Sequence, residues 1–171
     1  APVGRHLRPG LSNNEIEQLT AGLPFTLSDE LRTFYQWHDG VLELARPEWP
    51  YFPGGRIIHP LHVSLTSYAR WIEIPPGYDV YNPLWFPINS LDGYSLVVDC
   101  GVRPGEASPI HYVDNKADFE WEDICAPSLL NAVQLWNRML DDGYWVWDPY
   151  ECEWEDHYAD IPIELIHTHL V

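Results

Sequence analysis

The sequence is poor in positive charge and lacks long apolar runs. Only 9 of its 171 residues are Lys or Arg, against 26 Asp and Glu, and the formal net charge is −17. Because proteins hold phosphates with Lys and Arg, this balance argues against nucleic acid or an anionic membrane as a direct partner. No apolar run approaches the ~18 residues of a membrane span, and no basic and apolar leader opens the chain. We therefore expect a cytoplasmic protein.

Metal, redox and catalytic motifs are also missing. Cys100, Cys125 and Cys152 show no CxxC spacing, which predicts neither a disulfide framework nor a zinc cluster. The histidine pairs at 59/62 and 167/169 lack the three or four converging ligands that zinc needs. The sequence has no glycine-rich phosphate loop, GxSxG elbow or HExxH motif. It therefore predicts a protein that is not an enzyme and that needs no metal and no cofactor.

The composition is nevertheless that of a folded domain. Hydrophobic residues make up 46% of the chain and aromatic residues 14%, too many for a disordered protein. A chain of 171 residues suits one domain, because domains usually have ~100–200 residues. We predict a single domain over residues 1–171, with a loop rich in Pro and Gly at 46–55.

Two helices are predicted near the N-terminus. Ser12 and Glu15 form a capping-box pattern before a helix with helical apolar spacing that Gly22 and Pro24 end. A second helix should begin at Ser28 and end at residues 39–40, with Gly40 as its left-handed C-cap. A short connection between them predicts a helical hairpin.

The middle of the chain predicts a sheet followed by a late helix. A helix is expected at 64–74 and another, capped by Ser128 and ended by Gly143, at 128–142. Strands are expected at 85–88, 94–100, 109–113 and 119–124, with a turn at 91–93. Strands bracketed by helices without βαβ alternation predict an α+β domain: an antiparallel β-meander, a late helix packed on the sheet and an extended acidic C-terminal segment.

Acidic and aromatic residues are concentrated in this C-terminal part. Residues 118–171 contain 13 acidic residues and a single basic one, Arg138. The segment 144–158 combines three Trp and three Tyr with five acidic residues and has no Lys or Arg. Aromatic anchors surrounded by carboxylates are typical of a surface that binds a cationic partner. The same pattern arises where Trp145, Trp147 and Trp154 pack in the core beside solvated acids. Both interpretations stay open.

Several segments together resemble a known domain. They are PGLS at 9–12, LPFTLSDEL at 23–31, FYQWHDG at 34–40, WFPI at 85–88 and DGYSLVVD at 92–99, followed by the late helix within 127–144. In this order the segments resemble the SUKH superfamily, the domain of the yeast Smi and Knr cell-wall assembly regulators. The resemblance covers about residues 9–144 and leaves 145–171 as an acidic, aromatic tail.

The resemblance implies binding and no catalysis. In bacteria such domains are similar to immunity proteins, which block a polymorphic toxin that is often a nuclease, and in yeast they act in signalling and wall-assembly complexes. An acidic protein can occupy or cover the basic cleft with which a nuclease holds phosphate. We therefore expect a basic protein partner, namely a cognate toxin, with a regulatory scaffold and a small-ligand sensor as alternatives.

Two sets of residues are candidates for contact with a partner. The expected contact face comprises the acids and two tryptophans of the tail: Asp141, Asp142, Trp147, Asp148, Glu151, Glu153, Trp154, Glu155 and Asp156. A cleft near residues 39–40 is a second candidate, formed by Trp37, Asp39, Trp85, Asp92 and Tyr94. Ordinary packing of Trp between helix and sheet is the competing explanation for the second set.

Overall fold

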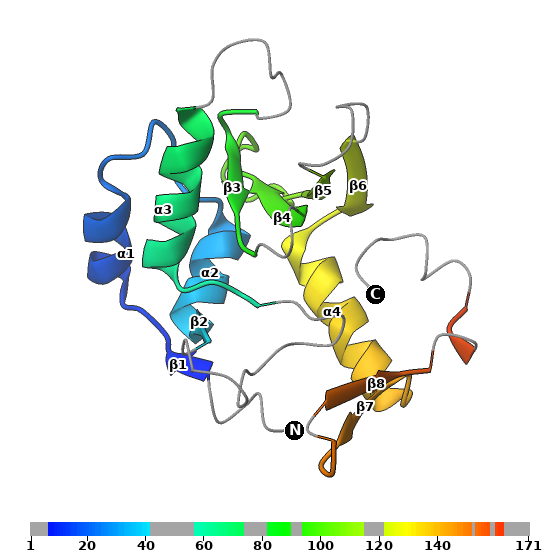
Figure 1. The fold of residues 1–171 in the computed structure, drawn as a ribbon. Coiled ribbons are helices and arrows are strands. Elements are labelled where there is room, and N and C mark those ends of the chain that lie inside the picture. Colours follow the sequence, from blue (N-terminus) through cyan, green and yellow to red (C-terminus); the bar gives the residue numbers. More distant parts are fainter. Residues whose placement is uncertain are drawn as a thin grey trace.

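The computed structural model describes residues 7–41, 57–73, 82–89, 94–114, 122–151, 153–157 and 160–162. Within these residues the chain is an α+β domain with three antiparallel sheets (Figure 1). Its helices are α1 (Asn13–Thr20), α2 (Asp29–Trp37), α3 (Leu61–Ile72) and α4 (Leu129–Asp141). Its strands are β1 (Leu7–Pro9), β2 (His38–Val41), β3 (Trp85–Pro87), β4 (Tyr94–Asp99), β5 (Ile110–Asp114), β6 (Glu122–Ala126), β7 (Trp145–Asp148) and β8 (Glu153–Asp156). None of the described helices is both long and apolar enough to span a membrane.

The capping signals in the sequence correctly locate the starts of three helices. The Ser12 hydroxyl accepts a hydrogen bond from the Glu15 amide, and the Glu15 carboxylate accepts one from the Ser12 amide at 2.8 Å. The Ser12 hydroxyl also donates to the same carboxylate oxygen at 2.7 Å, and this bond, together with the one from the Ser12 amide, lowers the pKa of Glu15. The Ser28 and Ser128 hydroxyls cap α2 and α4 by accepting from the Leu31 and Asn131 amides, three residues further on. Gly143 follows the end of α4, as predicted, and has a left-handed φ of 76°.

The predicted end of the second helix is wrong. Helix α2 ends at Trp37, and the chain enters β2 directly at His38 instead of reaching a C-cap at Gly40. Pairing with β1 causes the change, because His38 and Asp39 contact Arg8: His38 Nδ1 lies 2.8 Å from the Arg8 carbonyl, and Arg8 Nε donates to Asp39 at 2.8 Å. Gly40 does adopt a left-handed φ of 65°, but it does so within a strand.

The four-stranded sheet is the predicted meander, with β3, β4, β5 and β6 as consecutive antiparallel neighbours. Strand β6 ends two residues beyond the predicted strand at 119–124. The first three residues of that predicted strand, the predicted turn at 91–93 and the predicted loop at 46–55 lie outside the described part of the chain. Helix α3 begins three residues earlier than predicted. The Asp39 carboxylate accepts a hydrogen bond from the Leu61 amide at 2.7 Å and so caps the helix from a distant strand.

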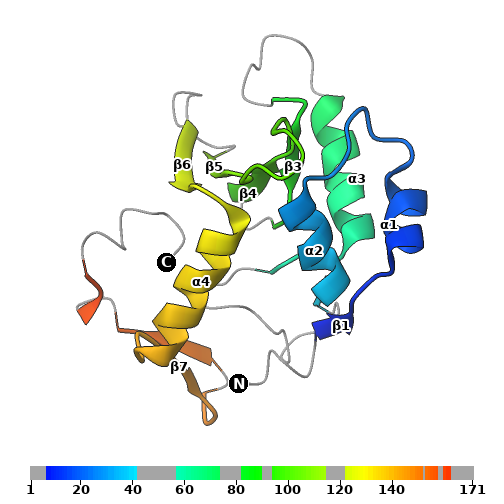
Figure 2. The ribbon, with the colours of Figure 1, turned by 180° about the vertical axis from the view of Figure 1, so that it is seen from behind.

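The main core lies between the helices and one face of this sheet. Tyr35, Phe86, Leu96, Ile110 and Leu129 belong to it and are at most 2% exposed. Figure 2 shows α2 and α4 together on the near side, with the sheet above and behind them. A smaller cluster of Trp85, Val97 and Val113 lies on the other face of the sheet, because successive strand residues point to opposite faces.

The acidic C-terminal segment contains a β-hairpin. Strands β7 and β8 pair in register from Trp145 opposite Asp156 to Asp148 opposite Glu153. The hairpin packs on the end of α4 through a third cluster made of Met139, Trp145 and Ile161. It lies at the end of the molecule away from the four-stranded sheet (Figure 1).

Candidate functional site

The hairpin and the end of α4 form the most acidic described part of the surface, here called the acidic end. It comprises Asp141, Asp142, Asp148, Glu151 and Glu155, together with Tyr150 at the hairpin tip. All are exposed except the half-buried Asp148. All nine predicted contact residues therefore lie on the hairpin or at the end of α4, which pack on a shared cluster, and the side chains of seven of them are described.

The hairpin register separates the tryptophans from the outward side chains. Trp145, Trp147 and Trp154 lie on the same face, because Trp147 is opposite Trp154 and alternate residues share a face. Trp145 is only 4% exposed and belongs to the core. Trp147 and Trp154 are half-buried, and their rings meet edge to face with centroids 5.5 Å apart. The tryptophans thus support the hairpin, while Val146 and Glu155 lie on its other face.

Few intramolecular cations balance the acidic end. Arg138 Nε lies 3.1 Å from an Asp142 carboxylate oxygen, and His157 lies 3.9 Å from Glu155. Arg138 is the single Lys or Arg in residues 118–171. Among the described residues, no ion pair with a guanidinium is formed by Asp141, Glu151 or Glu155. Because the local field of these carboxylates is not cancelled by arginine, it extends into solvent.

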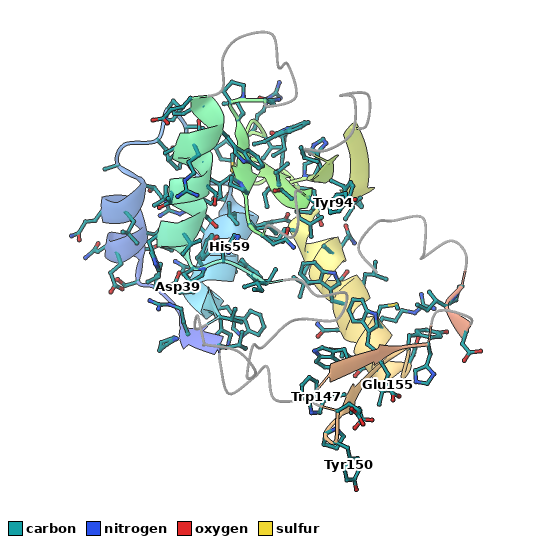
Figure 3. All side chains as sticks on the ribbon, viewed as in Figure 1. Asp39, His59, Tyr94, Trp147, Tyr150 and Glu155 are labelled. Carbon is teal, nitrogen blue, oxygen red and sulfur yellow. The ribbon has the colours of Figure 1, made fainter. Side chains whose placement is uncertain are left out.

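The hairpin tip presents an aromatic residue that the sequence analysis did not single out. The Tyr150 side chain is 92% exposed, and Figure 3 shows it pointing away from the body of the molecule. One Asp148 oxygen accepts hydrogen bonds from the Tyr150 amide at 2.6 Å and the Glu151 amide at 3.2 Å, which fixes the turn. The Asp-Pro pair at 148–149 is a turn-initiating signal that would have placed Tyr150 at a tip.

Two other predicted contact residues are described only by their backbone. Glu153 and Asp156 lie in β8, opposite Asp148 and Trp145, and their side chains fall outside the described part.

The structure does not bring together the described members of the predicted cleft. Trp37 is 59% exposed at the end of α2. Trp85 is 4% exposed and lies on the face of the sheet opposite the main core, where it stacks on His111 with ring centroids 4.3 Å apart. Tyr94 stacks on Tyr112 at 5.5 Å and lies well apart from Asp39 (Figure 3). Asp92 lies outside the described residues.

Asp39 has a structural environment. It is 3% exposed, and its carboxylate holds both Arg8 and the first amide of α3. Both carboxylate oxygens therefore have partners inside the fold. Through these two contacts Asp39, which lies in β2, connects this strand to β1 and to α3. These contacts account for an acid at this position without any ligand.

The two described cysteines are buried, and the described His, Cys, Asp and Glu side chains form no cluster of the kind that binds a metal ion. Burial raises the pKa of the Cys100 thiol to about 11, so it stays protonated near neutral pH and is a poor nucleophile. Cys125 is also buried. Among the described residues, no three His, Cys, Asp or Glu side chains are grouped so as to hold a metal ion.

No protein-family model matches this chain, and no curated protein matches its sequence.

Proposed function

We propose that this chain is a non-enzymatic protein-binding domain that holds a basic protein against its acidic end. The observation that carries the proposal is Tyr150, which is 92% exposed at the tip of the hairpin, on the same hairpin as Glu151 and Glu155, which have no arginine partner among the described residues. Tyrosine is a frequent anchor residue in interfaces because its rigid ring covers a large area at small entropic cost. Carboxylates around such an anchor attract Lys and Arg of a partner and accept bidentate bonds from Arg.

The resemblance to the SUKH superfamily makes a toxin the proposed partner. Under this proposal the chain acts in the cytoplasm as a stoichiometric inhibitor, an immunity-like protein. A toxin that cleaves nucleic acid carries a basic surface for phosphate, and such a surface is complementary to the acidic end. A regulatory scaffold of the Smi and Knr type is the alternative, because it needs the same binding surface without a toxic partner.

Capture from the source cells tests the binding surface. The wild-type protein should retain a basic partner that the triple variant Asp141→Lys, Glu151→Lys, Glu155→Lys loses. Matched reversals at Glu17, Glu73 and Glu106 change the net charge equally but lie elsewhere, so they should retain the partner. Retention by both triple variants would contradict the proposed surface, because it would show that neither the site nor the total charge matters.

Growth measurements then separate the immunity role from the scaffold role. The captured partner, expressed alone, should arrest growth, and co-expression of the wild-type chain should restore it. The acidic-end variant should restore growth much less than the matched control variant. A partner that is harmless when expressed alone would reject the immunity role and favour the scaffold.

A further inference from the structure

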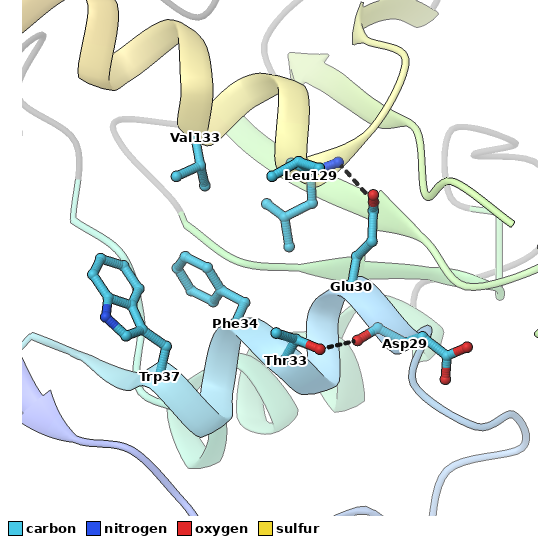
Figure 4. A pocket seen from close by; sticks show the side chains of 8 residues that line it. Asp29, Glu30, Thr33, Phe34, Trp37, Leu129 and Val133 are labelled. Atoms are coloured by element: carbon cyan, nitrogen blue, oxygen red, sulfur yellow. Dashed lines mark hydrogen bonds between the residues drawn. The ribbon is translucent and has the colours of Figure 1, made fainter. Parts of the chain in front are cut away.

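An apolar groove of about 370 Å³ lies between α2 and the first half of α4 (Figure 4). The acidic end lies at the other end of α4. Phe34 and Trp37 of α2 form one wall, and Leu130 and Val133 of α4 form the other. The sequence gives no hint of this groove, because its two walls lie about a hundred residues apart in the chain.

The groove exposes large apolar side chains on a rigid support. Trp37 is 59% exposed and Leu130 is 56% exposed. The half-buried Phe34 ring packs edge to face against both Tyr35, which is fully buried, and Trp37, with centroids 5.7 and 6.3 Å away. A surface that is both apolar and held in place loses little entropy on binding, which favours its use as a docking site.

One end of the groove is acidic. Asp29 and Glu30 lie there, on the side of the α4 N-terminus, with the Asp29 carboxylate directed outward past the end of the groove, whereas Trp37 lies at the opposite end (Figure 4). Glu30 accepts hydrogen bonds from the Ser108 and Leu129 amides at 3.1 and 3.0 Å, and Asp29 accepts one from the Gly105 amide at 2.8 Å. These bonds fix the carboxylates in position without neutralising their charge. None of the residues that line the groove is Lys or Arg.

We propose that this groove binds a short amphipathic helix of a partner protein. Its apolar side chains would contact Phe34, Trp37 and Leu130, and a Lys or Arg would face Asp29 and Glu30. The α2 stretch from Asp29 to Trp37 spans about 12 Å, which is the length of just over two helical turns. Apolar residues at i, i+4 and i+7 of a partner helix match this length. The site is separate from the acidic end and does not depend on the function proposed above.

The openness of the groove favours a helix over a small molecule. Binding pockets for small molecules bury most of the ligand surface. Here two wall residues remain more than half exposed, so a small ligand would keep much of its own apolar surface in water. A helix instead covers both walls and places its polar face outward.

Two synthetic peptides test the proposal. Both form helices of about three turns with the same Leu positions, but one carries Lys and the other Glu at the polar positions. Fluorescence anisotropy of the labelled peptides is measured at about 0.15 M salt, where surface charge is screened beyond roughly 8 Å. The Leu/Lys peptide should bind at least ~10-fold more tightly than the Leu/Glu peptide. Trp37→Ser and Leu130→Ser should each weaken its binding ~10-fold or more, as truncation of an anchor residue does.

Ile72→Ser is the matched control. Ile72 is 57% exposed on α3, outside the groove, so this variant loses an equally exposed apolar side chain and should bind within about twofold of wild type. Equal affinity for the two peptides, failure of the Leu/Lys peptide to bind, or unchanged affinity in the groove variants would overturn the proposal. So would stronger loss in the acidic-end triple variant than in Leu130→Ser. A dimer that Leu130→Ser dissociates in sedimentation would assign the groove to a second copy and also overturn it.

Discussion

The Gly40→Ala variant should lose about 3 kcal/mol of unfolding free energy, because two separate costs add. Gly40 has a φ of 65°, and this left-handed conformation costs a residue with a Cβ roughly 1–2 kcal/mol. The added Cβ would also stand 2.5 Å from backbone atoms of His59 and Pro60. Backbone atoms cannot rotate away as a flexible side chain can, so overpacking costs a further ~1–3 kcal/mol. Urea denaturation followed by far-ultraviolet circular dichroism measures the loss.

Gly105→Ala isolates the conformational part of this cost. Gly105 has a φ of 79°, yet nothing lies within 4 Å of the Cβ that alanine would add there. This variant should therefore lose only ~1–2 kcal/mol. Equal losses of unfolding free energy in the two variants would contradict the overpacking cost. They would show that the backbone at residues 59–60 moves away from the added Cβ at little energetic cost.

The parts of the fold that the sequence predicts well depend on contacts between near neighbours in the chain. Ser12, Ser28 and Ser128 each accept a hydrogen bond from an amide three residues further on, so the signal and the contact lie in the same short segment. The same applies to Gly143, whose left-handed conformation ends α4. The meander strands are similarly local, because each pairs with the next strand along the chain.

The errors arise where distant residues compete with a local signal. Gly40 does adopt the left-handed conformation that its sequence pattern predicts. The helix nevertheless ends earlier, at Trp37, because the next residues pair with β1 as strand β2. Helix α3 begins early because its cap is Asp39, which lies 22 residues before the amide that it accepts from. In both cases the partner residue lies far away in the sequence. The sequence of the helix itself therefore does not show the contact, and rules based on periodicity and capping cannot detect it.

The candidate sites divide in the same way. The acidic end is local, since residues 141–155 form consecutive elements, and their composition alone draws attention to them. The predicted cleft required Trp37 and Trp85 to meet. Trp85 instead lies on the face of the four-stranded sheet opposite the main core, and its assignment to that face depends on the register of β3 against β4. The groove between α2 and α4 requires two helices to pack at long sequence separation, which only the structure supplies.

Charge and anchor should act on different steps of binding at the acidic end. For the partner that capture identifies, Tyr150→Ala should raise the dissociation rate constant about 10-fold or more and leave the association rate constant nearly unchanged, because an aromatic anchor acts after encounter. Surface plasmon resonance measures both constants. A variant that changes only association would contradict the role of Tyr150 as an anchor and would indicate that it merely shapes the hairpin.

The reversal of Asp141, Glu151 and Glu155 to Lys should slow association roughly 10- to 100-fold at low salt, because steering by complementary charge raises association rates by about 10- to 1000-fold. In wild type, the rate constant should fall as salt shortens the screening length from about 10 Å at 0.1 M to about 3 Å at 1 M. In the triple variant this dependence should vanish or change sign. The matched reversals at Glu17, Glu73 and Glu106 produce the same net charge elsewhere, so they should preserve most of the salt dependence. If both triple variants lose it equally, the total charge of the chain attracts the partner, and the acidic end has no special part in encounter.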